Sequence, residues 1–288
     1  GYSSAASDVY KRQDQDRISE AVITAENSDV VILCVGLNET LEGEEGDTGN
    51  SDASGDKVDL HLPKVQEELI EKVTAVGKPT IVVLMAGSAI DLNYAQDNCN
   101  GILLAWYPGA RGGRAIADLL FGKESPSGKL PITFYKDLEG MPEFTDYSMK
   151  NRTYRYMEKE ALYPFGYGLT YSDTCVTEAE VVGEVSAESD IMLKATVKNN
   201  GTVDTDEVVQ VYIKDLDSPL AVRNYSLCGF KRVSLKAGEE KSVEFTISNK
   251  AMNIVDEDGN RYIAGKHFRL FAGVSQPDTR SAELTGHK

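Results

Sequence analysis

Runs of apolar residues alternate with helix-like segments through the first half of the sequence, and this alternation constrains the fold most. Four runs have the length and composition of buried strands: Val30–Gly36, Thr80–Met85, Gly101–Trp106 and Leu130–Phe134. Apolar residues recur at helical spacing in four other segments: 16–27, 63–76, 89–95 and 112–121. Strands that alternate with helices predict an α/β fold in which helices sandwich a mainly parallel sheet.

After about Tyr171 the apolar residues follow a period of two instead. Alternating segments occupy residues 191–197, 207–213, 241–247 and 267–272, with Gly- and Asn-rich turns between them. This pattern predicts an all-β sandwich of the immunoglobulin or fibronectin III type. The expected domains are therefore 14–172 (α/β) and 173–288 (sandwich). Residues 1–13 are small and polar without any period, which predicts a non-native or disordered tail.

Composition excludes several classes of function. The net charge of −16 disfavours nucleic acid and anionic membrane surfaces, and no apolar run approaches the roughly 18 residues of a membrane span. The four cysteines match no zinc or CxxC spacing, and the three histidines are widely scattered. We therefore expect no metal site, no cofactor and no Ser-His-Asp triad. Cys34, inside the first apolar run, is expected to be a small core residue.

The loop from Leu37 to Leu62, which leaves the first predicted strand, is the first candidate for a functional site. Ligands of open α/β sheets bind beyond the carboxyl ends of the strands. Five acids crowd into nine residues here: Glu39, Glu42, Glu44, Glu45 and Asp47. Such crowding can keep one carboxyl protonated near neutral pH, as a general acid requires. A solvated surface loop is the plainer interpretation, and a calcium loop at 47–56 is a weaker one because the EF-hand pattern is missing.

Two further segments could bind an anion or pair with acids. Glycines and arginines in 108–114 could hold an anion at a helix N-terminus, but we favour close packing of the helix against the sheet. Arg152 or Arg155, in a basic and aromatic segment, could pair with the acidic loop. Structural ion pairing elsewhere is the default for both arginines.

The ordered set of motifs resembles the C-terminal half of glycoside hydrolase family 3, the β-glucosidase and β-xylosidase family. The strongest motifs are Leu-Glu-Gly-Glu-Glu at 41–45, Ser-Pro-Ser-Gly-Lys-Leu-Pro-Ile-Thr-Phe at 125–134 and Tyr-Pro-Phe-Gly-Tyr-Gly-Leu-Thr-Tyr at 163–171. The segments Gly-Phe-Lys-Arg-Val at 229–233 and Gly-Lys-His-Phe at 265–268 are similar to the fibronectin type III-like domain of that family.

The resemblance implies a retaining β-glycosidase whose active site is shared between domains. An N-terminal TIM-like barrel, absent from this chain, would carry an Asp nucleophile, and the α/β domain would supply a Glu as acid/base. The implied substrates are β-linked gluco- or xylo-oligosaccharides or aryl glycosides. The chain is then expected to be a C-terminal fragment that is inactive alone. A periplasmic or secreted location fits the family, although the residues do not decide the compartment.

The resemblance also ranks the candidates for the acid/base. Xylosidase-like members carry a Glu-x-Glu pair whose second Glu fits the role, which selects Glu44, with Glu42 second and Glu45 third. The family's Asp-Arg is replaced here by Asp56-Lys57. The alternative from another class is a carbohydrate-binding or scaffolding module without chemistry, which oligosaccharide titration would reveal.

Overall fold

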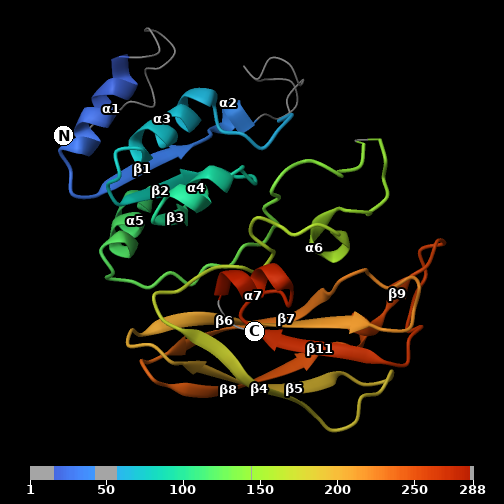
Figure 1. Ribbon diagram of the computed structural model, residues 1–288. Coiled ribbons are helices and arrows are strands. Elements are labelled where there is room, and N and C mark those ends of the chain that lie inside the picture. The colour runs from blue at the N-terminus through green and yellow to red at the C-terminus, as the bar shows by residue number, and fades with distance from the viewer. Residues whose placement is uncertain (1–15, 43–56, 144, 286–288) are drawn as a thin grey trace. The chain divides into compact units, whose positions relative to one another are not determined.

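The computed structural model describes residues 16–42, 57–143 and 145–285, which form two compact units (Figure 1). The α/β unit comprises the described residues up to Ile116 together with 135–138, and the sandwich unit comprises 117–134 and 139 onward. This division differs from the expected boundary between residues 172 and 173, which stays a prediction. The expected tail, residues 1–13, lies outside the described residues.

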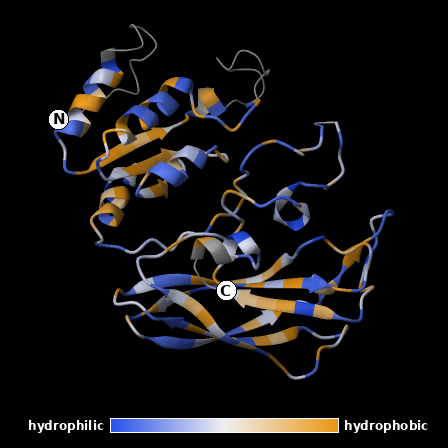
Figure 2. Cartoon of the chain, in the orientation of Figure 1, coloured by the Kyte–Doolittle hydropathy of each residue, from blue (hydrophilic) through white to orange (hydrophobic). Residues whose placement is uncertain are grey.

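The α/β unit contains a three-stranded parallel sheet in the order β1-β2-β3. Its strands are β1 (Val31–Gly36), β2 (Thr80–Met85) and β3 (Gly101–Leu104). Its helices are α1 (Asp16–Glu26), α2 (Glu39–Glu42), α3 (Lys64–Thr74), α4 (Asn93–Asn98) and α5 (Gly112–Leu120), the last of which continues into the other unit. Figure 2 shows the strands as mainly apolar and the helices as mixed. The predicted parallel α/β fold is confirmed.

Burial follows the position of each strand in the sheet. Val82 and Val83 of the central strand point to opposite faces, and both have no exposed surface. The edge strand β1 instead buries alternate residues, Leu33 and Val35. Cys34 lies on the other face of β1 and is exposed, so its expected place in the core was wrong. The apolar run alone could not distinguish an edge strand from a central one.

The predicted strand Leu130–Phe134 does not join the parallel sheet. Its backbone pairs instead with a later segment, through Leu130 N–H to Tyr167 O at 2.8 Å and Phe134 N–H to Tyr163 O at 2.9 Å. Pro131 has no N–H to donate, which prevents a regular ladder in the middle of the segment. This part of the prediction was wrong, and the segment belongs to the sandwich unit.

The sandwich unit contains two three-stranded antiparallel sheets, in the orders β4-β5-β8 and β11-β6-β7, and a two-stranded antiparallel sheet of β10 and β9. The strands are β4 (Thr174–Val182), β5 (Ile191–Asn199), β6 (Thr205–Asp215), β7 (Ser226–Leu235), β8 (Glu240–Ile247), β9 (Ile254–Val255), β10 (Arg261–Tyr262) and β11 (Phe268–Gly273). Helices α6 (Thr153–Tyr156), η1 (Asn249–Met252) and α7 (Thr279–Thr285) complete the unit. The four predicted segments correspond to β5, β6, β8 and β11.

The core of the sandwich follows directly from the period of two. Inward residues of three strands form one cluster: Ile191, Leu193, Ala195, Val197, Val209, Val211, Ile213, Val243, Phe245 and Ile247. Burying one Val, Leu, Ile or Phe contributes about 1.5–3 kcal/mol relative to exposure. The alternation therefore fixes the register of the strands, because a shift by one residue would expose this whole set.

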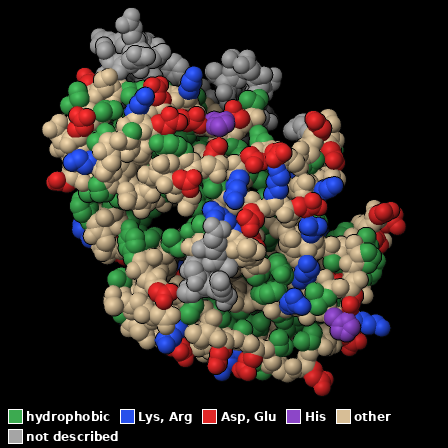
Figure 3. Space-filling model, in the orientation of Figure 1, with side chains coloured by type: hydrophobic (Ala, Val, Ile, Leu, Met, Phe, Trp, Pro, Cys, Tyr) green, Lys and Arg blue, Asp and Glu red, His purple; other side chains and the backbone are tan. Residues whose placement is uncertain are grey.

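Charged side chains of both signs cover the outside of both units. Figure 3 shows acidic and basic residues interspersed over the visible face. Among the described residues no helix has the length and apolar character of a membrane span.

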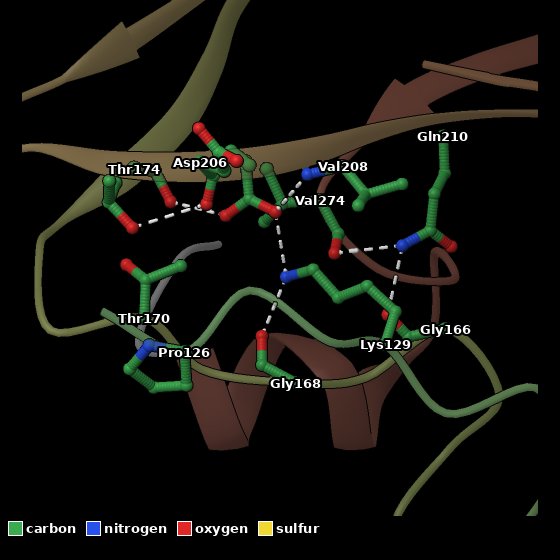
Figure 4. A network of polar contacts seen from close by, with 12 residues as sticks. Pro126, Lys129, Gly166, Gly168, Thr170, Thr174, Asp206, Val208, Gln210 and Val274 are labelled. Atoms are coloured by element: carbon green, nitrogen blue, oxygen red, sulfur yellow. Dashed lines mark hydrogen bonds and ion pairs between the residues drawn. The ribbon is translucent and has the colours of Figure 1, made fainter. Parts of the chain in front are cut away.

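A buried ion pair fastens residues 125–134 to the sandwich (Figure 4). Lys129 Nζ lies 2.8 Å from Glu207 Oε1, and the side chains are only 8% and 1% exposed. Lys129 also donates to the Gly168 carbonyl at 2.6 Å, and Thr174 donates to Glu207 Oε2 at 2.5 Å. Both charges are thus paired and hydrogen-bonded, as burial of charges demands.

Replacing Lys129 with Met should strongly destabilise the chain, because Glu207 would remain buried without a counter-charge. The expected loss in free energy of unfolding is about 3–5 kcal/mol. The matched control is Lys236→Met, whose partner Asp204 lies 2.7 Å away at side-chain exposures of 77% and 56%. That surface pair should contribute little, because both side chains are exposed to solvent and their charges are screened. Urea denaturation measures both, and equal losses would contradict the account.

Candidate active site

The carboxyl ends of the three parallel strands lie at one edge of the sheet, where α/β proteins usually bind ligands. The short helix α2, which ends at Glu42, follows β1 after two residues (Figure 1). Gly87 and Ser88 follow β2, and Tyr107 follows β3. These residues come together around a single carboxylate.

Glu42 accepts hydrogen bonds from three donors at this edge. The Gly87 N–H donates to Oε1 at 2.5 Å, and the Ser88 hydroxyl donates to Oε2 at 2.7 Å. The Tyr107 hydroxyl donates to Oε1 at 2.9 Å. Lys57 adds a nearby positive charge and donates to Ser88 Oγ at 3.4 Å. The beginning of the acidic loop is therefore tied to the ends of both β2 and β3.

The end of β1 is fixed equally firmly, which sets the direction in which the loop leaves the sheet. Gln66 of α3 accepts from the Gly36 N–H at 2.8 Å and donates to the Gly36 carbonyl at 2.9 Å. The Leu37 N–H continues the ladder to Met85 O at 2.8 Å. A Cβ at Gly36 would lie 1.9 Å from that same oxygen, so only glycine fits. Asn38 then caps α2 by accepting from the Leu41 N–H at 3.0 Å.

The turn that presents Tyr107 is strained. Trp106 has a φ of 52°, in the left-handed region that bulky residues avoid, at a cost of order 1–3 kcal/mol. The sequence predicted that Trp106 is the last residue of this strand, but it lies two residues beyond the end of β3. A Cβ at Gly87 would come within 2.9 Å of the Tyr107 ring and 3.5 Å of Glu42 Oε1. The glycine thus allows the tyrosine and the glutamate to meet.

The returning limb of the loop, residues 57–62, is held at its far end. The Asp91 N–H donates to the Leu60 carbonyl at 2.7 Å. His61 Nδ1 lies 2.8 Å from Glu67 Oε1, and this hydrogen bond raises the pKa of His61. Both described limbs of the loop are therefore anchored to the α/β unit.

The environment of Glu42 favours its ionised form. Partial burial is the largest single influence and acts to raise the pKa, but the hydrogen bonds from Ser88, Gly87 and Tyr107 and the charge of Lys57 together outweigh it, so the pKa of Glu42 lies below its usual value. Lys57 has a lowered pKa, because partial burial outweighs the attraction of Glu42 and Asp59. A carboxylate held in this way is a poor proton donor at neutral pH.

The structure locates some predicted site residues and not others. Glu42 is described, whereas Glu44 and Glu45 lie outside the described residues. Arg152 donates to three carbonyls of its own loop, those of Glu143, Asp146 and Ser148. Arg155 lies over the ring of the neighbouring Tyr154, with 5.8 Å from Cζ to the ring centroid.

Sequence reasoning assigned no role to three residues that build the site: Gln66, Ser88 and Tyr107. A signal for two of them was present, because Ser88 and Tyr107 each follow a predicted buried strand within three residues. Their side-chain contacts with Glu42 span 46 and 65 residues of sequence, and no local pattern encodes such contacts.

The described residues offer no group of three or more His, Cys, Asp or Glu side chains that could hold a metal ion. The glycine-rich turn at 108–114 has a packing role at one position at least. A Cβ at Gly112 would lie 2.3 Å from Cβ of Pro108, so the helix can begin there only with glycine. This contact is local to the turn, so close packing of the helix against the sheet stays a prediction.

Comparison with known proteins identifies the family. The model of the glycosyl hydrolase family 3 C-terminal domain matches residues 2–171, which is more than half of the chain. The chain belongs to glycosyl hydrolase family 3. A fibronectin type III-like domain model matches residues 207–276, in agreement with the sandwich. The family 3 match begins inside the segment expected to be a foreign tail.

Family 3 relatives resemble almost the whole chain. A xylan 1,4-β-xylosidase from Xylanibacter ruminicola is 39% identical over 270 residues, covering 92% of this chain and 31% of that protein. The structure of a β-glucosidase from Bifidobacterium adolescentis has a TM-score of 0.80 at 31% identity, covering 93% and 40% of the two chains. A Listeria innocua β-glucosidase in complex with glucose has a TM-score of 0.74 at 27% identity, covering 93% and 38%. The chain thus spans between 31% and 40% of the length of these proteins.

The contribution of Glu42 to stability should depend on pH with a definite sign. Its pKa is lower in the folded chain than the ordinary 4.5, so the stabilisation is complete above that value and is lost as the pH falls through the folded-state pKa. Glu42→Gln should therefore be less stable than wild type at pH 7, and the difference should shrink as the pH falls below 4.5.

Urea denaturation at several pH values measures this difference. Glu71→Gln, which changes an exposed acid of α3, is the control for the loss of one surface charge. A stability difference for Glu42→Gln that grows on acidification would contradict the assignment.

Proposed function

We propose that this chain supplies the general acid/base of a retaining β-glycosidase of family 3, with Glu44 in that role. The observation that carries the proposal is the fastening of the acidic loop, through Glu42, to the carboxyl-end edge of the parallel sheet. Because the described start of the loop is fixed at that edge and the chain belongs to this family, we favour a catalytic role for the loop over that of a solvated surface loop.

Glu44 is preferred over Glu42 for a chemical reason. A general acid must carry a proton at the working pH, and the three donors around Glu42 favour its ionised form. The same donors occupy both of its oxygens. Glu44 is two residues away and remains the first choice, with Glu45 as the next alternative.

The proposed reaction has two steps that share one proton carrier. In the first, a carboxylate nucleophile attacks the anomeric carbon while Glu44 protonates the bridging oxygen, so the C–O bond breaks and a glycosyl-enzyme forms. In the second, ionised Glu44 removes a proton from water, whose oxygen then displaces the nucleophile. We assign the nucleophile to a TIM-like barrel that precedes this chain in the whole protein.

The proposed substrates are β-linked gluco- or xylo-oligosaccharides and aryl β-glycosides. The relative from X. ruminicola is named a xylan 1,4-β-xylosidase, and the L. innocua β-glucosidase was solved with glucose. These names support a neutral sugar substrate, which is also compatible with a chain of net charge −16.

Replacing Glu44 with Ala in the whole protein should affect substrates according to their leaving groups. Glycosides with poor leaving groups need protonation of the bridging oxygen, so kcat/KM should fall by roughly 10²–10⁴-fold. Activated aryl glycosides should lose much less, because their leaving group departs as an anion. Steady-state kinetics on a matched pair of aryl β-xylosides measures the contrast.

Azide provides the control for this experiment. It attacks a glycosyl-enzyme without general-base help, so it should restore turnover of activated substrates by Glu44→Ala and yield a β-glycosyl azide. Glu45→Ala, made in parallel, should show neither effect. Equal losses on both leaving groups, or rescue of Glu45→Ala alone, would remove Glu44 from the role.

The chain alone is expected to be inactive on aryl β-glycosides, since the proposed nucleophile and sugar pocket lie in the barrel. Turnover by the purified chain above that of a Glu44→Ala control would contradict this. The same sample distinguishes the alternative of a binding module. Micromolar affinity for β-linked oligosaccharides in calorimetric titration would favour a module without chemistry.

A further inference from the structure

We propose that the outer face of the β11-β6-β7 sheet binds a sugar that carries a carboxylate, which is a uronic-acid unit. The residues that would hold it are Lys214 and Arg269, with the rings of Tyr225 and Phe271 beside them. This binding site goes beyond the proposed function and is independent of it, because it lies wholly in the sandwich unit.

Two cations are neighbours on this face. Lys214 and Arg269 lie directly opposite each other in the antiparallel pairing of β6 with β11, and Figure 1 shows these strands in one sheet. Lys214 follows Ile213, which belongs to the sandwich core, so the lysine and its partner are on the outer face. Directly opposite residues have Cβ atoms about 5 Å apart, and like charges there repel each other. An anion bound between the two charges would remove this repulsion.

Both side chains retain donors for such an anion. Lys214 Nζ donates one hydrogen bond, to the Arg223 carbonyl at 2.7 Å, and an ammonium group has three donors. Arg269 is exposed, and within the described parts of the chain its guanidinium has neither a hydrogen bond nor an ion pair. A guanidinium can donate to both oxygens of one carboxylate. The two side chains are therefore suited to a single carboxylate.

Two aromatic rings lie beside the cations. Lys214 Nζ is 5.4 Å from the centroid of the Tyr225 ring, and this ring meets Phe271 edge to face with the centroids 4.6 Å apart. Phe271 is two residues from Arg269 in β11 and shares its face. Both rings are partly exposed. Ligand sites combine apolar surface with a few placed polar groups, so the C–H face of a sugar ring can pack here while its carboxylate reaches the cations.

The loop that borders this site is fixed in place. Asn224, the neighbour of Tyr225, donates from Nδ2 to the Tyr154 and Met157 carbonyls, each at 2.9 Å. Its N–H donates to the Arg155 carbonyl at 2.9 Å. The exposed Arg155 adds a third cation at this border. In a chain of net charge −16, cations gathered at one place produce a local field that attracts an anion.

The test is an NMR titration of this chain with a matched pair of sugars. Methyl β-glucuronide should shift the amide signals of Lys214 and Arg269 saturably. Methyl β-glucoside has a hydroxymethyl group in place of the carboxylate, so it should bind roughly tenfold more weakly or worse. No saturable shift with the glucuronide, or equal affinity for the two sugars, would overturn the proposal.

A pair of variants locates the site. Arg269→Gln should weaken binding of methyl β-glucuronide by about tenfold or more, because the guanidinium fork is lost. The matched control is Arg261→Gln, which removes an exposed positive charge from β10, a strand of another sheet. Its affinity should equal that of the wild type. Unchanged affinity in Arg269→Gln, or the same loss in both variants, would contradict the assignment.

Two further probes decide the chemical class of the ligand. Acetate offers the carboxylate without a ring, so it should bind roughly tenfold more weakly than methyl β-glucuronide. Equal affinity for acetate would reduce the site to a simple anion site and overturn the proposal. A glutamate residue blocked at both ends tests an acidic peptide instead. Affinity for this peptide equal to that for the sugar acid would also overturn it.

Discussion

The carboxylate of Glu42 receives donors from two strand ends at once, and the arrangement of the whole site depends on this interaction. Opposing effects determine how strongly the ionised form of Glu42 is favoured. Partial burial penalises the charge, whereas one N–H, two hydroxyls and the Lys57 ammonium stabilise it. Because the second set prevails, the loop that leaves β1 begins from a fixed point.

The two units stabilise a buried or partly buried carboxylate with different partners. In the α/β unit, Glu42 lies at the rim of the sheet, where hydroxyl donors and a half-buried lysine suffice. In the sandwich unit, Glu207 is almost completely buried and needs the full ammonium of Lys129 together with Thr174. The second pair explains why residues 125–134 belong with the sandwich although their sequence resembles a strand of the α/β sheet. Removal of one partner would leave the other charge buried without compensation, which is strongly destabilising.

Sequence periodicity predicted the elements well where burial decides the structure. The bounds of β2 were predicted to the residue, and β5 and β8 followed from strict alternation. The prediction failed where the outcome depends on neighbours distant in sequence. Cys34 is exposed because it lies on the face of β1 opposite the buried Leu33 and Val35, and Leu130–Phe134 pairs with residues 163–167. The Glu42 contacts with Ser88 and Tyr107 were beyond the reach of local patterns for the same reason.

The most direct test of the central claim is a carboxyl ¹³C titration of Glu42 by NMR in this chain, with Tyr107→Phe alongside. The account predicts a pKa below the ordinary 4.5 in the wild type and a shift upward when the tyrosine hydroxyl is removed. A pKa at or above 4.5 that does not respond to Tyr107→Phe would show that the carboxylate is not held at the sheet edge.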